Sequence, residues 1–233
     1  MKHKSAVIFA VAMTISATIL GAFFYLSRQG EHTISVTGSA SQNFICDTVK
    51  WTVTMRESVG RDELALGYRL LEEKTQKLLR EFTSNGVSPD EITIKPINAY
   101  KDYGQQGFQG YNLEQTVYLI STEIDKVEGW ALHPVKLVDQ GITIENSTLE
   151  YFYSKLDDLK KDLLANATAN AEERALNMLA NTDLQLGKVL SMRSGVFQIT
   201  EPLSTMVSSS GIYDTSTREK QISVTAHVTY AIK

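Results

Sequence analysis

The segment at residues 155–181 constrains the fold more than any other part of this sequence. Its apolar residues recur at steps of three and four, so they share one face of a helix. They are Leu156, Leu159, Leu163, Ala167, Ala171, Ala175 and Met178. Because alanine lets a helix backbone approach its partner closely, the segment predicts a long helix packed on a flat surface such as a sheet. It carries no recognisable chemistry.

Length and composition allow one sizeable core or two small ones, since the chain has 233 residues and 42% of them are hydrophobic. The formal net charge is −4, and the chain after Lys2 and Lys4 is more acidic still. A mildly acidic body argues against nucleic-acid binding, which usually needs a basic face. The sequence holds one cysteine, so no intrachain disulfide can form.

Residues 5–26 form an uncharged apolar run after a short basic start. As a helix this run spans roughly 33 Å, which matches a bilayer core of about 30 Å. The run is longer than the apolar core of a signal peptide and lacks a small-residue cleavage site after it. We therefore expect an uncleaved single-pass anchor in the cytoplasmic membrane, with a cleaved signal peptide as the alternative.

The charges around this run set the expected topology. Lys2 and Lys4 precede it, whereas Arg28 and Glu31 follow it, which favours an N-terminus inside the cell. Residues 1–30 are thus predicted to be the anchor and link, and residues 31–233 an extracytoplasmic α+β domain, periplasmic in a Gram-negative cell. Signal cleavage would instead give a secreted or periplasmic protein.

Alternating and helical patterns divide the body into strands and helices. Strands are predicted at 33–38, 49–56, 91–103, 111–121, 142–153, 187–200 and 221–233, and helices at 62–83, 125–139 and 155–181. Pro96 places its strand at an edge or a bulge, and Pro134 either kinks its helix or divides it. This order predicts an α+β fold with largely antiparallel sheets packed by two to three helices, preceded by one N-terminal transmembrane helix.

Two loops stand out. Residues 104–110 are rich in glycine and are predicted to be a flexible hairpin tip. Residues 201–217 are rich in Ser, Thr and Gly and are predicted to be a mobile loop.

The pieces of this chain, in their order and spacing, resemble the SIMPL domain family over residues 31–233. The matching pieces are ISVTGSA, the strand from Asp47 to Thr54, SNGVSPDEITIKPI, the Gly110-Tyr111 step before TVYLIST, VKLVDQGIT, ANATANAEERALNMLA and QISVTAHVTYAI. The resemblance implies an extracytoplasmic protein, with oligomers and oxidative-stress tolerance known in the family and no agreed catalytic residues. Cys46 stands where a proline is often found, and Pro134 interrupts a usually regular helix.

No constellation in the sequence identifies an active site, and we predict no catalytic, cofactor-binding or metal-binding residues. The histidines, His3, His32, His133 and His227, have no metal-ligand spacing. Cys46 is expected to be a small half-buried apolar residue, with a reactive thiol or an intermolecular disulfide as the alternative. No cofactor is expected.

Paired or repeated residues also have ordinary explanations. The adjacent acids Asp157-Asp158 and Glu172-Glu173 diverge around a helix and are expected to be solvated. Gly104, Gly107 and Gly110 precede no helix, so they indicate flexibility. The glycosylation sequons at Asn146 and Asn166 would mean little in a bacterium.

We therefore expect a membrane-anchored, non-enzymatic SIMPL-type protein of the cell envelope, held in the membrane by residues 5–26, which works as a homo-oligomer. Assembly is expected through a sheet edge at the closing strand 221–233 and through the hairpin at 103–111. If a helix or an earlier strand covers that closing strand, the body would be a monomer. The alternatives are a ligand- or peptide-binding module that uses the groove between sheet and helices, and an envelope hydrolase with a dispersed site.

Overall fold

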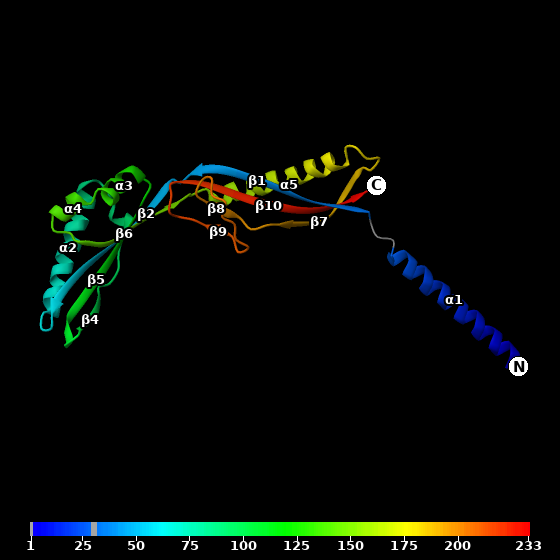
Figure 1. The fold of residues 1–233 in the computed structure, drawn as a ribbon, viewed down its shortest axis with the longest axis horizontal. Coiled ribbons are helices and arrows are strands. Elements are labelled where there is room, and N and C mark those ends of the chain that lie inside the picture. Colours follow the sequence, from blue (N-terminus) through cyan, green and yellow to red (C-terminus); the bar gives the residue numbers. More distant parts are fainter. Residues whose placement is uncertain (1, 29–31) are drawn as a thin grey trace. The chain divides into compact units, whose positions relative to one another are not determined.

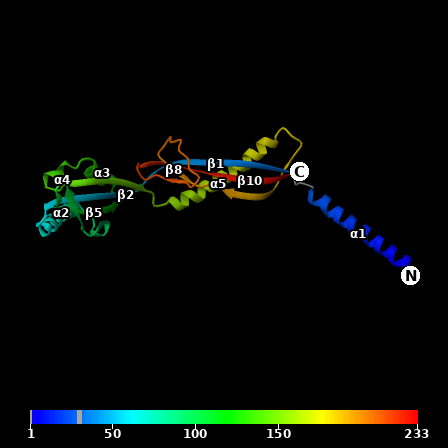
Figure 2. The ribbon, with the colours of Figure 1, turned by 60° about the horizontal axis from the view of Figure 1, so that its bottom comes forward.

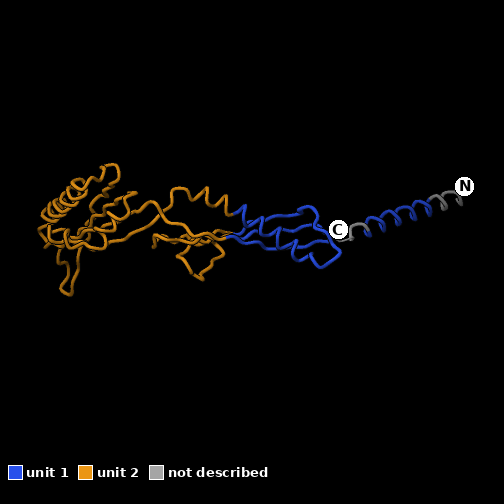
Figure 3. Tube along the Cα trace, turned by 90° about the horizontal axis from the view of Figure 1, so that it is seen from above, with its two compact units in different colours: residues 1–40, 164–195, 225–233 blue, residues 41–163, 196–224 orange. Residues whose placement is uncertain are grey.

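The computed structural model describes residues 2–28 and 32–233, with side chains at residues 9–25 and 32–233. The chain divides into two compact units, which Figure 3 colours separately. Unit 1 comprises residues 1–40, 164–195 and 225–233, and unit 2 comprises residues 41–163 and 196–224.

Helix α1 (Lys2–Arg28) includes the apolar run at 5–26, so the helix predicted there is confirmed. In the part of the chain that the structure describes, no helix is both long enough and apolar enough to cross a membrane. The His3 side chain and residues 29–31, which include part of the predicted link, lie outside the described residues. The boundary between anchor and body stays a prediction.

Unit 1 contains three antiparallel strands with one long helix beside them. The strands are β7 (Leu186–Ser194) and parts of β1 (Thr33–Ile45) and β10 (Glu219–Ile232). The helix is part of α5 (Leu156–Leu179). Strand β10 lies between β1 and β7, and Figures 1 and 2 both show α5 running along this sheet. Alternation along β10 buries Val228 and Tyr230 but leaves His227 exposed, so one face packs and the other is open.

Helix and sheet approach closely at one glycine. A Cβ atom added at Gly38 would lie 2.1 Å from the carbonyl oxygen of Ala167 and 2.4 Å from the backbone nitrogen of Ala171. Ala167, Ala171 and Ala175 are completely buried, which confirms the predicted alanine face. A side chain at Gly38 or a larger one on α5 would force the two backbones apart.

The buried face of α5 follows one row of residues four apart: Leu159, Leu163, Ala167, Ala171, Ala175 and Leu179. The prediction that Met178 belongs to this face is wrong, because Met178 is 62% exposed and Leu179 is buried instead. Rows of residues four apart are inclined to the helix axis. Because a sheet is twisted, its contacts with a helix can follow one of these inclined rows. Mixed steps of three and four instead define a face parallel to the helix axis, which is what the sequence pattern predicted.

Unit 2 contains a second, wholly antiparallel sheet of five strands. They are β2 (Thr48–Gly60), β3 (Ile92–Ile94), β4 (Asn98–Gly104), β5 (Gly107–Ser121) and β6 (Ile144–Phe152). Strand β2 lies between β5 and β6, while β3 and β4 both pair with the other side of β5. Pro96 separates β3 from β4 at this edge, as its backbone chemistry predicted.

Helices cover one face of this second sheet (Figure 1). They are α2 (Leu64–Ser84), α3 (Ile124–Leu132) and α4 (Val135–Asp139), with the short 3-10 helix η1 (Pro89–Glu91) beside them. Phe82 lies between two tryptophans, with ring centroids 5.6 Å from Trp51 and 5.1 Å from Trp130. Pro134 divides the predicted helix at 125–139 into α3 and α4, so the two-piece alternative is correct.

Unit 2 also contains the start of β10, together with β8 (Gln198–Thr200) and β9 (Ile212–Tyr213). Strand β8 is antiparallel to β10 but parallel to β9. Strand β9 falls inside the predicted mobile loop at 201–217, so part of that loop is regular structure. The α+β class with antiparallel-rich sheets is confirmed, although in the described part of the chain four α-helices, α2 to α5, accompany the sheets rather than two or three.

The prediction that the closing strand 221–233 lies at a sheet edge is wrong. Strand β10 lies between β1 on one side and β7 and β8 on the other, and β1 is the outermost strand. An alternating pattern indicates which face of a strand is buried, but it does not identify the neighbours of that strand. The earlier strand β1 covers β10, as the alternative reading allowed. The monomer expected in that case does not follow from this cover, because the edge on this side of the sheet belongs to β1 instead.

Candidate functional site

Ionisable groups with shifted pKa values gather around the single cysteine in unit 2. Such groups often mark functional sites, although structural ion pairs produce them too. We call this set, with the buried Lys220 among them, the Cys46 cluster. Its members are Cys46, Asp47, Tyr151, Tyr213, Asp214, Arg218 and Lys220.

Strand ends bring the cluster together. Cys46 lies in the link between β1 and β2, and its N–H donates to the Arg218 carbonyl just before β10 (2.9 Å). Tyr151, near the end of β6, donates its N–H to the Thr215 carbonyl (2.8 Å). These two hydrogen bonds hold residues 215–218 against the β1–β2 link and against β6.

Cys46 is buried, with only 3% of the residue exposed. Burial raises its pKa, while the nearby Lys220 ammonium acts in the opposite direction and Asp47 adds to the increase. A thiol with a raised pKa stays protonated near neutral pH and is a weak nucleophile. The geometry therefore favours the predicted apolar packing role over the reactive thiol.

Lys220 is almost completely buried, with 1% of its side chain exposed. Its Nζ lies 3.4 Å from Asp214 Oδ1 and 3.4 Å from Thr217 Oγ1. Burial alone would raise the pKa of Asp214, but the Ser216 N–H (2.6 Å) and the Lys220 charge hold it below its usual value. The buried cation is thus paired with a carboxylate that stays ionised.

A second polar network joins β6, α3 and Arg218, the residue just before β10. Tyr151 donates its hydroxyl to Glu128 Oε1 (2.7 Å), and Arg218 Nη1 donates to Asp125 Oδ1 (2.6 Å). The same guanidinium nitrogen lies 3.9 Å from Glu128 Oε2. Burial, and then the Glu128 carboxylate, raise the pKa of Tyr151 well above its ordinary value, so the phenol stays protonated.

Asp47 binds the residues that lie just before the start of α5. Its two carboxylate oxygens accept hydrogen bonds from the N–H (2.9 Å) and the hydroxyl (2.5 Å) of Ser154, and Thr48 donates a third (3.0 Å). Burial opposes ionisation, but these donors hold the pKa of Asp47 below its usual value. This carboxylate therefore ties the β1–β2 link to the residues before the helix.

The Cys46 cluster consists of matched pairs. The Lys220 ammonium faces Asp214, the Arg218 guanidinium faces two acids, and the Asp47 oxygens face Ser154. Acid–base catalysis needs a group that can reach a substrate and change its proton. In this arrangement Asp214 compensates the buried Lys220 charge, as a buried ion requires, whereas the Arg218–Asp125 pair is more exposed.

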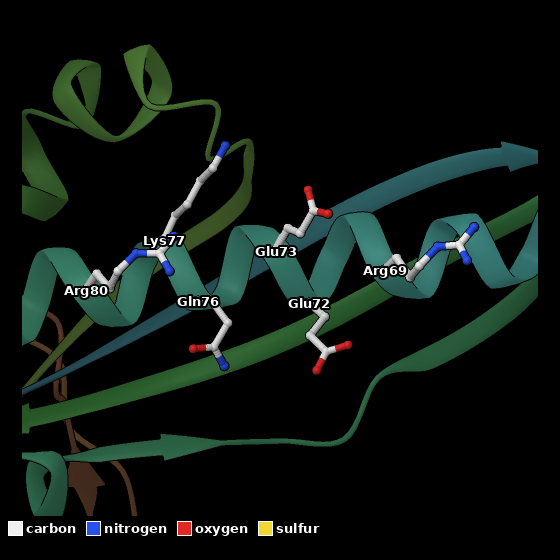
Figure 4. A pocket seen from close by; sticks show the side chains of 6 residues that line it. All are labelled: Arg69, Glu72, Glu73, Gln76, Lys77 and Arg80. Carbon is white, nitrogen blue, oxygen red and sulfur yellow. The ribbon is translucent and has the colours of Figure 1, made fainter.

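A hollow of about 490 Å³ lies elsewhere on unit 2. Its lining residues are Arg69, Glu72, Glu73, Gln76, Lys77 and Arg80. All of them belong to α2, and Figure 4 shows their side chains pointing away from the helix in different directions. This hollow is a charged helix surface, and its side chains do not converge on a common point.

The structure does not bring together the histidines that the sequence analysis considered as possible metal ligands. His227 Nδ1 lies 2.8 Å from the hydroxyl of Thr37, and the His32 carbonyl accepts a hydrogen bond from Ile232. His133 lines a different hollow at α3 and α4. Among the described residues, no group of three His, Cys, Asp or Glu side chains is placed to hold a metal ion.

The remaining sequence features have local roles. Asp157 and Asp158 lie near Lys160 and Lys161, and Glu172 and Glu173 are exposed. Gly107 has a φ of +97° in the β4–β5 hairpin, whereas Gly110 leaves room for the Val59 carbonyl oxygen, 2.0 Å from a Cβ added there. Asn146 and Asn166 are exposed on β6 and α5.

Sequence reasoning missed Lys220, Asp214 and Tyr151. The sequence does contain one indication of Lys220. It lies an even number of residues from the buried Ile222 and Val224 of β10, so the alternation places it on the same face of the strand. A charge on the buried side of a strand requires a partner. The pattern could not identify Asp214 as that partner.

Comparison with known proteins defines the family. The sequence model of the SIMPL family, a protein of unknown function (DUF541), matches residues 34–231. The chain is also similar to the Interleukin-1 receptor-associated kinase 1-binding protein 1 homolog of Xenopus laevis, at 21% identity over 168 residues. That match covers 72% of this chain and 65% of the relative's own length. Because the family match spans nearly all of residues 32–233, this chain belongs to the SIMPL family.

Proposed function

We propose that this SIMPL protein is a non-enzymatic protein of the cell envelope that works by self-association. The observation that carries this proposal is the open edge of β1, the outermost strand of its sheet. The pairs within the Cys46 cluster support the non-enzymatic part, because they engage the ionisable groups that a hydrolase would have to use.

Hydrogen bonds fix which backbone groups of β1 face β10. The Ile232 N–H donates to the His32 carbonyl (2.8 Å), and the Cys46 N–H donates to the Arg218 carbonyl (2.9 Å). In an antiparallel pair, hydrogen-bonded residues alternate along each strand. Even-numbered residues of β1 therefore bond to β10, and the backbone groups of odd-numbered residues point outward.

Helix α5 covers this edge at two points. Arg174 Nη1 donates to the Thr37 carbonyl (2.9 Å), and the Ser39 N–H donates to Asn170 Oδ1 (3.1 Å). The other outward positions have no backbone hydrogen-bond partner among the described residues; they are Thr33, Ser35, Ser41, Asn43 and Ile45. Unpaired backbone donors and acceptors at an edge can pair with a strand of another chain.

A second copy of this chain supplies a matching edge. Two β1 strands that pair antiparallel would present the same residues to each other, as in an isologous dimer. The alternative from another class is a peptide-binding module, in which an extended segment of a different protein adds to the same edge. The name of the Xenopus laevis relative describes a binding protein, which fits this alternative.

The proposal places the body outside the cytoplasm, anchored through residues 5–26. Support comes from the uncharged run at these residues and from Lys2 and Lys4 before it. An anchored protein keeps its N-terminus and resists alkaline extraction from membranes. A mature start after residue 26, found by mass spectrometry, would show a cleaved signal peptide instead. The stress-related role that the resemblance implies stays a prediction.

The edge is tested by one substitution in the full chain. Ser41→Pro removes an outward N–H and leaves the hydrogen bonds to β10 in place, a position where an edge strand tolerates proline. We expect this variant to lose pairing between copies in detergent at micromolar concentration, while Ser41→Ala, which keeps the N–H, associates like the wild type. A wild-type protein that sediments as a monomer would contradict the proposal.

A further inference from the structure

A hollow of about 440 Å³ lies on unit 2, where α3 and α4 meet the end of α2. We call it the α3–α4 hollow. Three helices and the residues at their ends contribute to its lining, whereas the hollow along α2 is lined by that helix alone. Its volume lies within the range of small-molecule sites. The lining residues are Glu81, Asn85, Asp125, Lys126, Gly129, Trp130, His133 and Lys136.

Hydrogen bonds fix the walls of the α3–α4 hollow to one another. Gln140, at the end of α4, donates its Nε2 to Glu81 Oε2 (3.1 Å), and its carbonyl accepts from Lys77 Nζ (3.2 Å). On the α3 side, the Trp130 ring packs on Phe82 in the core, with 5.1 Å between ring centroids. Walls held in this way need little rearrangement when a ligand binds, so less binding free energy is lost on ordering them.

Gly129 leaves the α3–α4 hollow open at the middle of α3, where glycine is a poor helix former. Two structural reasons for a glycine are a positive φ and a close approach of another segment. Neither applies here, because Gly129 has no positive φ and a Cβ added to it meets no atom within 4 Å. The fold therefore does not require this glycine, whereas an open hollow does.

Trp130 supplies a hydrogen-bond donor to the lining. Only 9% of this residue is exposed, and its indole N–H has no hydrogen-bond partner among the described residues. The other tryptophan, Trp51, donates its N–H to Ser147 Oγ (2.8 Å). The Trp130 N–H is not closed off from a ligand, because in the described part of the chain only Arg56 Nε is a fully buried side-chain nitrogen or oxygen without a partner. An indole nitrogen donates and cannot accept, so the matching ligand group is an oxygen acceptor.

The uncompensated charge at the α3–α4 hollow is positive. Lys136 has no ion pair or hydrogen bond among the described residues. The other lining charges have partners: Lys126 binds Glu123, Asp125 accepts from Arg218 (2.6 Å), and the remaining acid accepts the hydrogen bond from the end of α4. A negatively charged ligand would therefore find one cation that is free to pair with it.

We propose that the α3–α4 hollow binds a small organic carboxylate with an apolar body. The carboxylate lies beside Lys136 and accepts the Trp130 N–H, while the body fills the space beside Gly129. A carboxylate fits both polar groups, because it is an anion whose oxygens only accept hydrogen bonds. The inference goes beyond the proposed self-association and is independent of it, since none of the lining residues belongs to β1.

The test is a titration of the isotope-labelled full chain in mild detergent with benzoate, followed by nuclear magnetic resonance. The chain has two tryptophans and therefore two indole N–H signals, which Trp130→Phe distinguishes. We expect benzoate to shift the Trp130 signal saturably and to leave the signal of Trp51 in place, because the Trp51 N–H is already bound in the core. Benzamide has the same ring without the charge and should bind about tenfold more weakly or less.

Three variants separate ligand binding from folding. Gly129→Leu should fill the hollow and weaken benzoate binding about tenfold or more, while the melting temperature stays within a few degrees because the first added atom meets no neighbour. Lys136→Gln should weaken benzoate binding about threefold to tenfold and leave benzamide binding unchanged. Lys188→Gln is the matched control at an exposed lysine of β7 outside the lining, and it should change neither.

The binding site is overturned if benzoate shifts neither tryptophan signal, or shifts both alike. The assigned contacts are overturned if Gly129→Leu and Lys136→Gln bind benzoate as the wild type does. Either result would leave the proposed self-association unaffected, because that proposal is tested at Ser41 on β1.

Discussion

Substitution of Gly38 by alanine should destabilise the protein strongly, because one methyl group would meet the backbone of α5. The added Cβ would lie 2.1 Å from the Ala167 carbonyl oxygen and 2.4 Å from the Ala171 nitrogen. Backbone atoms cannot turn aside as a flexible side chain can, so the helix would have to retreat by roughly 1 Å and loosen its contact with the sheet.

The cost should fall at the upper end of the range for overpacking, about 3 kcal/mol. For a chain of this length each kcal/mol lowers the melting temperature by about 2–4 °C, so we expect a decrease of roughly 6–12 °C. The assay is thermal unfolding of the full chain, followed by far-ultraviolet circular dichroism.

Gly129→Ala provides the matched control for the same chemical change. A Cβ added at Gly129, within α3, meets no atom within 4 Å, so alanine should be neutral or stabilise the helix by up to about 1 kcal/mol. If Gly38→Ala melts at the same temperature as Gly129→Ala, the close contact between α5 and β1 is refuted.

Three further predictions concern packing and charge. Ala171→Leu should cost about 1–3 kcal/mol of unfolding free energy by overpacking a buried site, while Ala169→Leu, at an exposed position of the same helix, should cost almost nothing in the same denaturation assay. Cys46→Ala should leave the melting temperature within a few degrees, since the thiol has no covalent partner, and a covalent dimer of the wild type on non-reducing gels would contradict its packing role. The folded-state pKa of Asp214 lies below its unfolded value, so its ionised form stabilises the fold above about pH 4, and this contribution is lost as the pH falls through the folded pKa. Urea unfolding between pH 2 and pH 7 should therefore show a smaller loss of stability in acid for Asp214→Asn than for the wild type; equal losses would rule this out.

Much of the fold could be predicted from the sequence because its signals are local. The alternation in β10 and the apolar spacing in α5 both follow directly from the periods of a strand and a helix. Pro96 and Pro134 interrupt elements through their own backbone chemistry, and both interruptions are present in the structure. These features depend on nearest neighbours along the chain, which a sequence records completely.

Strand neighbours could not be predicted in the same way. Strand β10 carries the most regular alternation in the chain, yet this pattern is the same for an edge strand and an interior strand. Its pairing with β1 joins residues from opposite ends of the body, such as Ser35 and Thr229, whose hydroxyls lie 2.9 Å apart. The open edge therefore had to be found from the pairing itself.

Asn170 shows how a sequence-based control can fail. Its place on the polar side of the helix predicts that Asn170→Leu should change little. The structure favours a larger effect, because Asn170 Oδ1 accepts the outward N–H of Ser39 on β1 (3.1 Å). A polar residue on a helix can cover a sheet edge as well as face solvent, and its helical position alone does not distinguish the two.

The Cys46 cluster could not be predicted from the sequence for a related reason. Its members come from the β1–β2 link, the end of β6 and the residues around the start of β10, which are far apart in the sequence. Only Lys220 could be noticed in the sequence, because it is a charged residue on the buried face of a strand. Its pairing with Asp214 depends on how the loop returns to β10, which no local pattern encodes.

The measurement that tests the central claim most directly is the mass of the full-length protein extracted in mild detergent, corrected for bound detergent. The chain mass is 25.9 kDa. Self-association predicts a multiple of this mass at micromolar concentration that falls in Ser41→Pro but not in Ser41→Ala. A single chain mass across the whole concentration range would contradict self-association and leave the peptide-binding module as the better account of the open edge.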